Sequence, residues 1–466
     1  MRVLNRRRRV RGPNTGSQVD DVELQSLSSR TRDANTLDRY LPILRCIFAL
    51  QDDQLRTYVG AGSYCRYLES CFGPLLTENY SGVWSMISKP KPKSAVDCWH
   101  LFEVAWCAAR AMNEDTSLEE IWVKICSVIV QGGSSTVLPQ NDNISNCGII
   151  SLFSVICWAT MTMQPVLDWS KLDESPRLLV RQQPFNQDSV RMDYKERPVK
   201  AIFRHFRRAM NTSQWRHPIG VNDHSGSASL EVSCLNFASL SEIAKISLTW
   251  VNDLTCHLDF DATKRQLSVF RFPTFCVLRI LGEQEEPHGT MMRTSDTTNE
   301  SSNDSQLFQE TLMSYRLLFG QTRGSQQLAK AALRKLQSTQ EGEYDELLNL
   351  LCTRSIDRRL HSLPTCVWPV TCRSFEDALQ EQSSYSSQDD FPLLGQRLAK
   401  IQEFTLRQQP SKLTDLWRDR RNPLQWYTFW AVLVVGGFSI LIGMLQLFVG
   451  IAQLVVALVP PQSCRC

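Results

Sequence analysis

The sequence lacks the short motifs that mark most enzymes and cofactor-binding proteins. No Gly-x-Ser-x-Gly, His-Glu-x-x-His or Cys-x-x-Cys pattern occurs, and the glycines at 60–62 and 132–133 do not have phosphate-loop spacing. The net charge of +3 provides no strong field of one sign, so no nucleic acid partner is indicated. We therefore assign no catalytic residue, no metal ligand and no cofactor from the sequence.

A secretory signal is also missing. The first nine residues carry five arginines with no apolar segment behind them, so we expect no export by that route. The 16 cysteines are mostly scattered singly along the chain, which favours reduced, mostly buried thiols in a cytosolic domain over a disulfide framework. N-glycosylation sequons begin at Asn79, Asn143, Asn211, Asn299 and Asn303, and in the cytosol these would stay unmodified.

One long apolar run is present near the end of the sequence. From Phe429 to Val459 there are 31 residues without a charge. A helix of this length measures roughly 46 Å at about 1.5 Å per residue, against about 30 Å for the hydrocarbon core of a bilayer. The run predicts a single transmembrane anchor within residues 425–460, with the lipid bilayer as its partner and a short tail at 461–466.

Arginines before this run predict its orientation, and aromatic residues around its start predict where it meets the membrane surface. Three arginines precede the run and one follows it, so the positive-inside rule places the bulk of the chain in the cytosol. We expect a single-pass, tail-anchored protein of the endoplasmic reticulum or another endomembrane. The expected interfacial anchor comprises Arg418, Arg420, Arg421, Trp426, Tyr427 and Trp430.

Small and amide side chains recur along one face of the predicted anchor, at spacings that alternate between three and four residues. Small residues let a second helix approach closely, and glutamines can hydrogen-bond across such a contact. The pattern indicates a homo-oligomer or pairing with another membrane helix; the alternative is an unpaired anchor in which these residues have no partner. The expected packing residues, called the seam below, are Gly436, Ser439, Gly443, Gln446, Gly450 and Gln453.

The rest of the sequence predicts a mainly α fold with a small β-hairpin or sheet. Residues 1–37 are polar and arginine-rich, as is typical of disorder, and 283–306 has the composition of a disordered linker. Residues 38–282 predict a mainly helical domain, and 307–424 predict a helical segment with polar loops. Ser117 followed by Glu120 is a capping box that predicts a helix start.

Two segments allow alternative interpretations. Residues 144–167 are uncharged and could form a second span, but their polar side chains and the absence of basic flanks favour a buried core helix. Residues 257–261 and 266–270 alternate polar and apolar around a turn, which predicts a hairpin. Its core-facing residues are expected to be Leu258, Phe260, Leu267 and Val269. His257, Asp259 and Asp261 would share the other face, as metal ligands could or, as we expect, as a solvated face.

The order of several blocks resembles an uncharacterised filamentous-fungal protein family with a single C-terminal transmembrane helix. The resembling blocks are Leu152–Met161, Trp250–Phe260, Ser314–Gly320 and Leu416–Trp430. The likeness spans most of residues 40–460 and implies lineage and topology, without an activity to carry over.

These observations favour a tail-anchored membrane protein with a cytosolic interaction or scaffold domain that binds a protein partner. The alternative is a membrane-tethered enzyme with a site assembled from distant residues such as His100, Cys147, His257 and Asp259. A third possibility, an anchor for nuclear or incompatibility signalling, rests on the arginine run at 6–9 alone.

Overall fold

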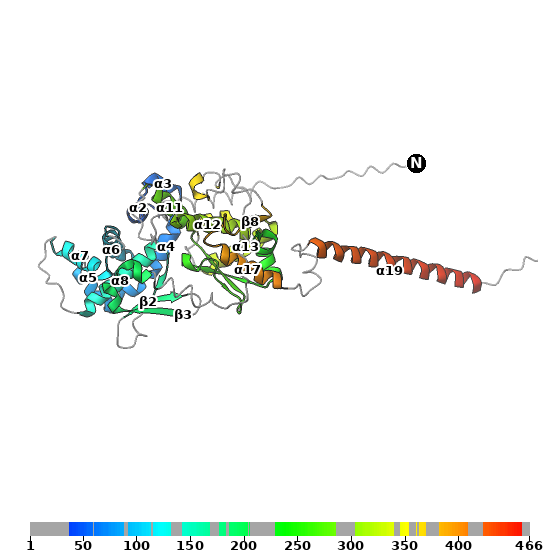
Figure 1. Cartoon of the computed structure of the whole chain (residues 1–466), viewed down its shortest axis with the longest axis horizontal. Helices are drawn as coiled ribbons and strands as arrows, with labels where there is room; N and C mark the ends of the chain where they lie inside the picture. The colour runs from blue at the N-terminus through cyan, green and yellow to red at the C-terminus, as the bar shows by residue number, and fades with distance from the viewer. Residues whose placement is uncertain are drawn as a thin grey trace, which may run out of the picture.

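The computed structural model describes the chain in segments (Figure 1). Arg418, Arg420, Arg421, residues 1–36 and the tail 461–466 lie outside the described residues. Of the expected linker, residues 283–285 belong to one helix and residues 303–306 to the next, and the rest also lies outside. The described segments are 37–58, 60–87, 92–112, 115–131, 142–167, 177–182, 186–203, 205, 229–285, 303–339, 345–353, 360, 363–369, 382–408 and 423–458.

The first half of the domain, residues 37–167, is built mainly from helices. The predicted capping box is confirmed, since the Ser117 backbone N–H donates to Glu120 at 2.8 Å and the Glu120 N–H donates to Ser117 Oγ at 3.1 Å. The helices are α2 (Leu41–Phe48), α3 (Asp52–Thr57), α4 (Ala61–Cys71), α5 (Ser81–Met86), α6 (Trp99–Arg110), α7 (Leu118–Gln131) and α8 (Asp142–Thr160), with short 3-10 turns η1 (Gly73–Leu76), η2 (Glu78–Tyr80) and η3 (Ala95–Cys98).

Helix α8 is a core helix, as the sequence favoured. It contacts α5, α6 and α7, and its side chains from Ile149 to Thr160 are buried. Being buried on all sides explains why its apolar residues show no single stripe. Its buried serines and threonine donate to carbonyls one turn back, as Ser154 Oγ does to Ile150 O at 2.8 Å, so the helix itself satisfies their polarity.

Helix α11 (Pro273–Glu285) joins the two halves of the domain and is buried along most of its length. It contacts α2 and α4 on one side and α12 (Asn303–Tyr315) on the other. Its Arg279 donates from Nη2 to Ala159 O at 2.6 Å, and the guanidinium lies 5.4 Å from the centre of the Phe48 ring. The charge is thus held at the C-terminal end of α8, where a helix dipole favours a cation.

The second half continues the helical packing. Beyond α12, a π-helical turn η7 (Arg316–Gly320) leads to α13 (Arg323–Thr339) and α14 (Glu346–Thr353); η7 contacts α12, α13 and α14, and α14 also packs on α12 and α13. The buried carboxylate of Glu310 on α12 accepts backbone N–H groups of Leu393 and Leu394, just before α17 (Gly395–Arg407). Other short elements are η4 (Met192–Glu196), α10 (Val232–Leu235), η5 (Ser239–Ile243), η6 (Leu254–Cys256) and η8 (Thr365–Val367).

The predicted hairpin is confirmed, but it is part of a larger sheet. Strand β6 (Phe260–Asp261) pairs antiparallel with β7 (Gln266–Phe270), and β5 (Ser247–Val251) pairs parallel on the other side of β7. All four expected core residues are buried. The expected solvated face is wrong at His257, which precedes the strand and is fully buried, because the backbone turns at Leu258 (φ 61°).

Two further sheets were not predicted. The first is antiparallel, with β1 (Gln164–Pro165), β2 (Arg177–Gln182) and β3 (Asn186–Arg191) in that order. In the second, β4 (Ser229–Glu231) pairs with β8 (Ser384–Ser386), so segments on either side of residues 283–306 share one ladder. A helix of 36 residues, α19 (Pro423–Leu458), follows the domain.

The close approach of α11 to α2 generates a prediction at Gly282. A Cβ added there would lie 2.1 Å from the backbone oxygen of Phe48, so Gly282→Ala should force the helices apart and lower the free energy of unfolding by about 1–3 kcal/mol. Gly62→Ala in α4 is the matched control, because its Cβ would meet nothing closer than 3.7 Å. That variant should be unchanged or about 0.5–1 kcal/mol more stable. Urea titration of both proteins checks this, and equal stability of the two would contradict the packing.

Candidate functional site

Helix α19 has an unburied apolar surface. Its segment Tyr427–Val455 spans 29 residues and includes an 18-residue window with a mean hydropathy of 2.4, none of which is buried. Among the residues that the structure describes, this is the one helix long and apolar enough to cross a membrane. Apolar surface costs about 25 cal/mol per Å² in water, so a helix that exposes this much of it needs lipid or partner helices around it.

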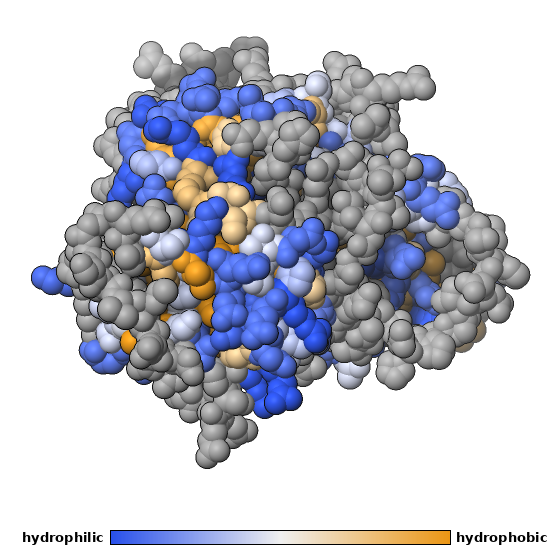
Figure 2. Space-filling model, turned by 60° about the vertical axis from the view of Figure 1, so that its left-hand side comes forward, coloured by the Kyte–Doolittle hydropathy of each residue, from blue (hydrophilic) through white to orange (hydrophobic). Residues whose placement is uncertain are grey.

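The surface of the domain differs from that of α19. In the part of the chain described, the large apolar side chains exposed outside α19 occur singly, at Val96, Val123, Leu393 and Leu406. Figure 2 shows one face of the molecule. Among the coloured residues on this face, hydrophilic ones cover most of the surface and hydrophobic ones cover smaller areas. Scattered apolar residues of this kind are normal for a water-facing surface, so the apolar exposure is concentrated in α19.

The predicted seam residues all lie in α19 and are exposed there. A Cβ added at Gly436, Gly443 or Gly450 would meet nothing within 4 Å. Ser439 Oγ donates to Val435 O at 2.9 Å within the helix. Pairing of the seam with a second helix stays a prediction. Of the expected interfacial residues, Tyr427 and Trp430 are in α19, and the Trp426 side chain is not among those described.

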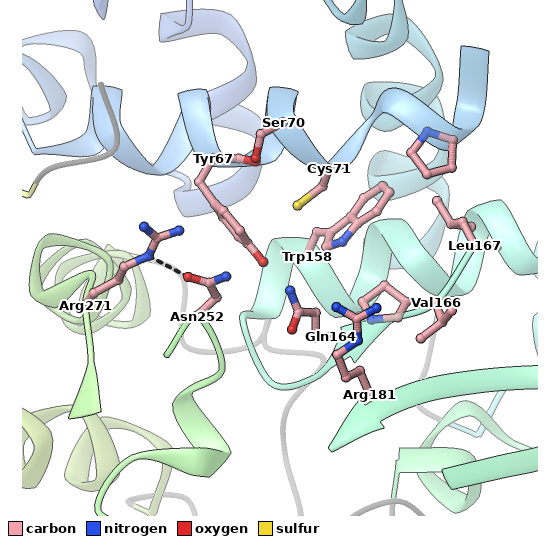
Figure 3. Close-up of a pocket in the computed structure, with 12 residues that line it drawn as sticks. Tyr67, Ser70, Cys71, Trp158, Gln164, Val166, Leu167, Arg181, Asn252 and Arg271 are labelled. Carbon is pink, nitrogen blue, oxygen red and sulfur yellow. Dashed lines mark hydrogen bonds between the residues drawn. The ribbon is translucent and has the colours of Figure 1, made fainter. Parts of the chain in front are cut away.

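A polar cleft of about 380 Å³ lies between helix α4, the end of α8 with strands β1 and β2, and the residues that follow strands β5 and β7. Figure 3 shows Arg271 and Arg181 on opposite sides, with Asn252 and Gln164 between them and the Tyr67 hydroxyl pointing into the same space. This volume is in the range of small-molecule sites. The lining residues are Tyr67, Ser70, Cys71, Pro74, Trp158, Gln164, Pro165, Val166, Leu167, Arg181, Asn252 and Arg271.

Strand registers place the polar groups of the cleft. Gln164 on β1 is paired with Arg181 on β2, so the two are cross-strand neighbours on one face of their sheet. In the other sheet Val251 is paired with Phe270, and the next residues, Asn252 and Arg271, lie side by side. Arg271 Nε donates to Asn252 Oδ1 at 2.5 Å, which fixes both side chains at the cleft.

The cleft has a positive character and an unused acceptor. Arg271 is 2% exposed, and its guanidinium lies 5.3 Å from the centre of the Tyr67 ring. The nearby carboxyl of Asp253 is also buried, and burial raises its pKa to about 7, so its charge offsets the arginines only in part at neutral pH. Gln164 Oε1 is buried without a hydrogen-bond partner, an arrangement that costs free energy unless a ligand donates to it.

The residues proposed for an enzyme site do not line this cleft. His257 is held in the core, where Nδ1 accepts the Phe270 N–H at 3.1 Å and Nε2 lies 2.7 Å from Ser314 Oγ. Burial lowers the pKa of His257 to about 3, so the imidazole is neutral.

The other residues of the proposed enzyme site are also separate from the cleft. The Cys147 thiol donates to Asn79 O at 3.4 Å, and burial raises the pKa of this thiol. His100 is half-buried in α6, and burial raises the pKa of Asp259. Within the described segments, no three His, Cys, Asp or Glu side chains are grouped as metal ligands.

The arginines of the cleft were missed from the sequence. Arg181 and Arg271 are isolated in separate segments, and no local motif connects them. Comparisons with protein-family models, with curated proteins and with solved structures find no match for this chain. The geometry described here is therefore the basis for a functional proposal.

The seam generates a prediction about association in membranes. Gly443→Leu combined with Gly450→Leu should abolish crosslinked dimers of the full chain in vesicles, because the two leucines would keep a second helix from approaching closely. Gly437→Leu provides the control, since Gly437 is also in α19 with nothing near it but is not part of the seam. An unchanged crosslinking pattern in the double variant would remove the seam as a contact.

Proposed function

We propose that this chain is a tail-anchored membrane protein whose mainly helical domain is a cytosolic interaction or scaffold module. The observation that carries the proposal is the 29-residue apolar span of α19, which is wholly unburied while the domain before it encloses its own core. A span of this length is sufficient to cross a bilayer with some tilt. Tethering would concentrate the domain at the membrane surface, where its partners would be recruited.

Sequence features support the orientation. Arg418, Arg420 and Arg421 precede the span, and positively charged residues favour the cytosolic side. The cysteines that the structure describes form no disulfide, in keeping with a reducing compartment. An endomembrane location and descent from the resembling fungal family remain parts of this proposal.

The topology can be tested directly in microsomes. With a glycosylation acceptor appended after Cys466, the tail should be glycosylated while added protease digests the domain and the five native sequons stay unmodified. Leu441→Arg combined with Leu445→Arg is the control, since each charge costs about 2.5–3.5 kcal/mol at mid-span and should prevent insertion. Glycans on the native sequons, or an unmodified tail, would refute the proposed topology.

The cleft supports a second candidate function, the binding of a small organic anion. Arg181 and Arg271 provide positive charge from opposite sides, while the Gln164 oxygen needs a donor, so the matching ligand has a carboxylate or phosphate and a hydroxyl or amino group. If the chain is instead a membrane-tethered enzyme, this ligand would be its substrate.

Glycerol 3-phosphate is a suitable probe because it carries both features. The variant Arg181→Gln removes one of the two charged partners of the phosphate. It should weaken the binding of glycerol 3-phosphate to the full chain about tenfold or more, since a hydrogen bond to a charged group contributes about 1.5–3 kcal/mol. Arg177→Gln alters an exposed arginine on the same strand that does not line the cleft, and should bind like wild type. Titration calorimetry in uncharged nanodiscs measures this. Absent binding, or equal loss in both variants, would reject the site.

A second set of nanodiscs distinguishes the source of the anion. If the natural ligand is a lipid headgroup, phosphatidic acid in the disc should compete and weaken glycerol 3-phosphate binding. If it is a free anion, the affinity should be the same in both discs.

A further inference from the structure

Two cysteines from different helices meet in the first half of the domain. Cys46 is near the end of α2 and Cys107 is in α6, 61 residues later, and their sulfur atoms are 2.7 Å apart. A disulfide bond measures about 2.05 Å, so the pair needs only a shift of about 0.7 Å to become bonded. Both residues are free thiols in the structure.

The backbone around the pair is held in place. The Cys46 carbonyl accepts two hydrogen bonds from α6, one from Trp106 Nε1 at 3.0 Å and one from Arg110 Nη1 at 2.9 Å. Both donors are within four residues of Cys107, so they fix the end of α2 against the turn of α6 that carries the second thiol. The approach of the two sulfurs is thus built into the packing of α2 on α6.

Access and protonation both favour reaction at Cys107. It is exposed, whereas Cys46 is half-buried and most other described cysteines are buried. A hydrogen bond from the Cys46 thiol lowers the pKa of Cys107 to about 7, with Arg110 acting in the same direction and burial and Glu103 opposing it. Since the thiolate is the reactive form, Cys107 is the nucleophile of the pair and Cys46 the resolving thiol.

We propose that Cys46 and Cys107 form a reversible disulfide when the protein meets a hydroperoxide. The Cys107 thiolate attacks the terminal peroxide oxygen, which breaks the O–O bond and gives Cys107 sulfenic acid and, after protonation, water or an alcohol. The Cys46 sulfur then attacks the Cys107 sulfur, forming the S–S bond and releasing the hydroxyl as water. Both sulfurs are oxidised by one electron each and the peroxide is reduced by two; glutathione can reverse the bond by thiol exchange.

Oxidation would lock α2 to α6 across the 61-residue separation. Such a cross-link stabilises mainly by restricting the unfolded chain. The oxidised protein should therefore unfold at a higher temperature than the reduced one, and a reductant should restore the original value.

Peptide mapping of the full chain tests the proposal. After treatment with hydrogen peroxide, non-reducing tryptic digestion should give a linked pair of peptides 46–56 and 94–110, which dithiothreitol separates. Peptide 94–110 also contains the buried Cys98, so Cys107→Ser must abolish the link. Cys147→Ser, at a half-buried cysteine elsewhere, should keep it. In Cys46→Ser, Cys107 should instead react with dimedone as a sulfenic acid.

Two wild-type results would overturn the proposal whichever variants fold: the absence of a 46–56/94–110 link after peroxide treatment, or oxidation of Cys107 to a sulfonic acid while Cys46 remains a thiol. Survival of the link in Cys107→Ser would also overturn it, because Cys98 would then be the bonded residue.

Discussion

The buried C-terminal end of α8 sets the constraint on which the domain depends. The last carbonyls of a helix have no partners within the helix, and here they cannot reach water. Arg279 of α11 bonds Ala159 O, and the hydroxyl of Tyr64 on α4 reaches Trp158 O at 3.2 Å. The guanidinium also lies over the rings of Phe48 in α2, Trp106 in α6 and Phe275 in α11. One buried cation thus contacts α8, α2 and α6 and holds its own helix, α11, against them.

Much of the architecture could be predicted because it depends on local patterns. The capping box at Ser117 and the alternation around residues 262–265 are complete within a few residues, so the helix and the hairpin follow from them. The polar side chains of 144–167 correctly indicated a core helix, because serine and threonine can donate to their own helix when buried. The apolar helix α19 was the strongest signal, since an uncharged run of 31 residues is longer than a bilayer span requires.

The remaining features depend on pairings between distant segments, which no window of sequence contains. Strands β2 and β3 do not alternate polar and apolar residues, so nothing in their sequences placed Arg181 beside Gln164. His257 was expected on a solvated face because the strand was assumed to begin there. The left-handed turn at Leu258 instead directs the imidazole toward Ser314, which is 57 residues away.

The ladder between β4 and β8 has a consequence for the order of folding during synthesis. It joins Leu230 to Tyr385, and Gln402 on α17, 171 residues from Glu231, accepts the Glu231 N–H and donates to Ser229 O. Contacts so distant in sequence are slow to form, and they cannot exist until the ribosome has made nearly the whole domain. The second half of the domain therefore closes only as the apolar helix α19 is itself being translated. The β4 edge is thus still unpaired while the apolar helix α19 is being made, so a chaperone that receives the chain at that stage has both an open strand edge and an apolar helix to protect.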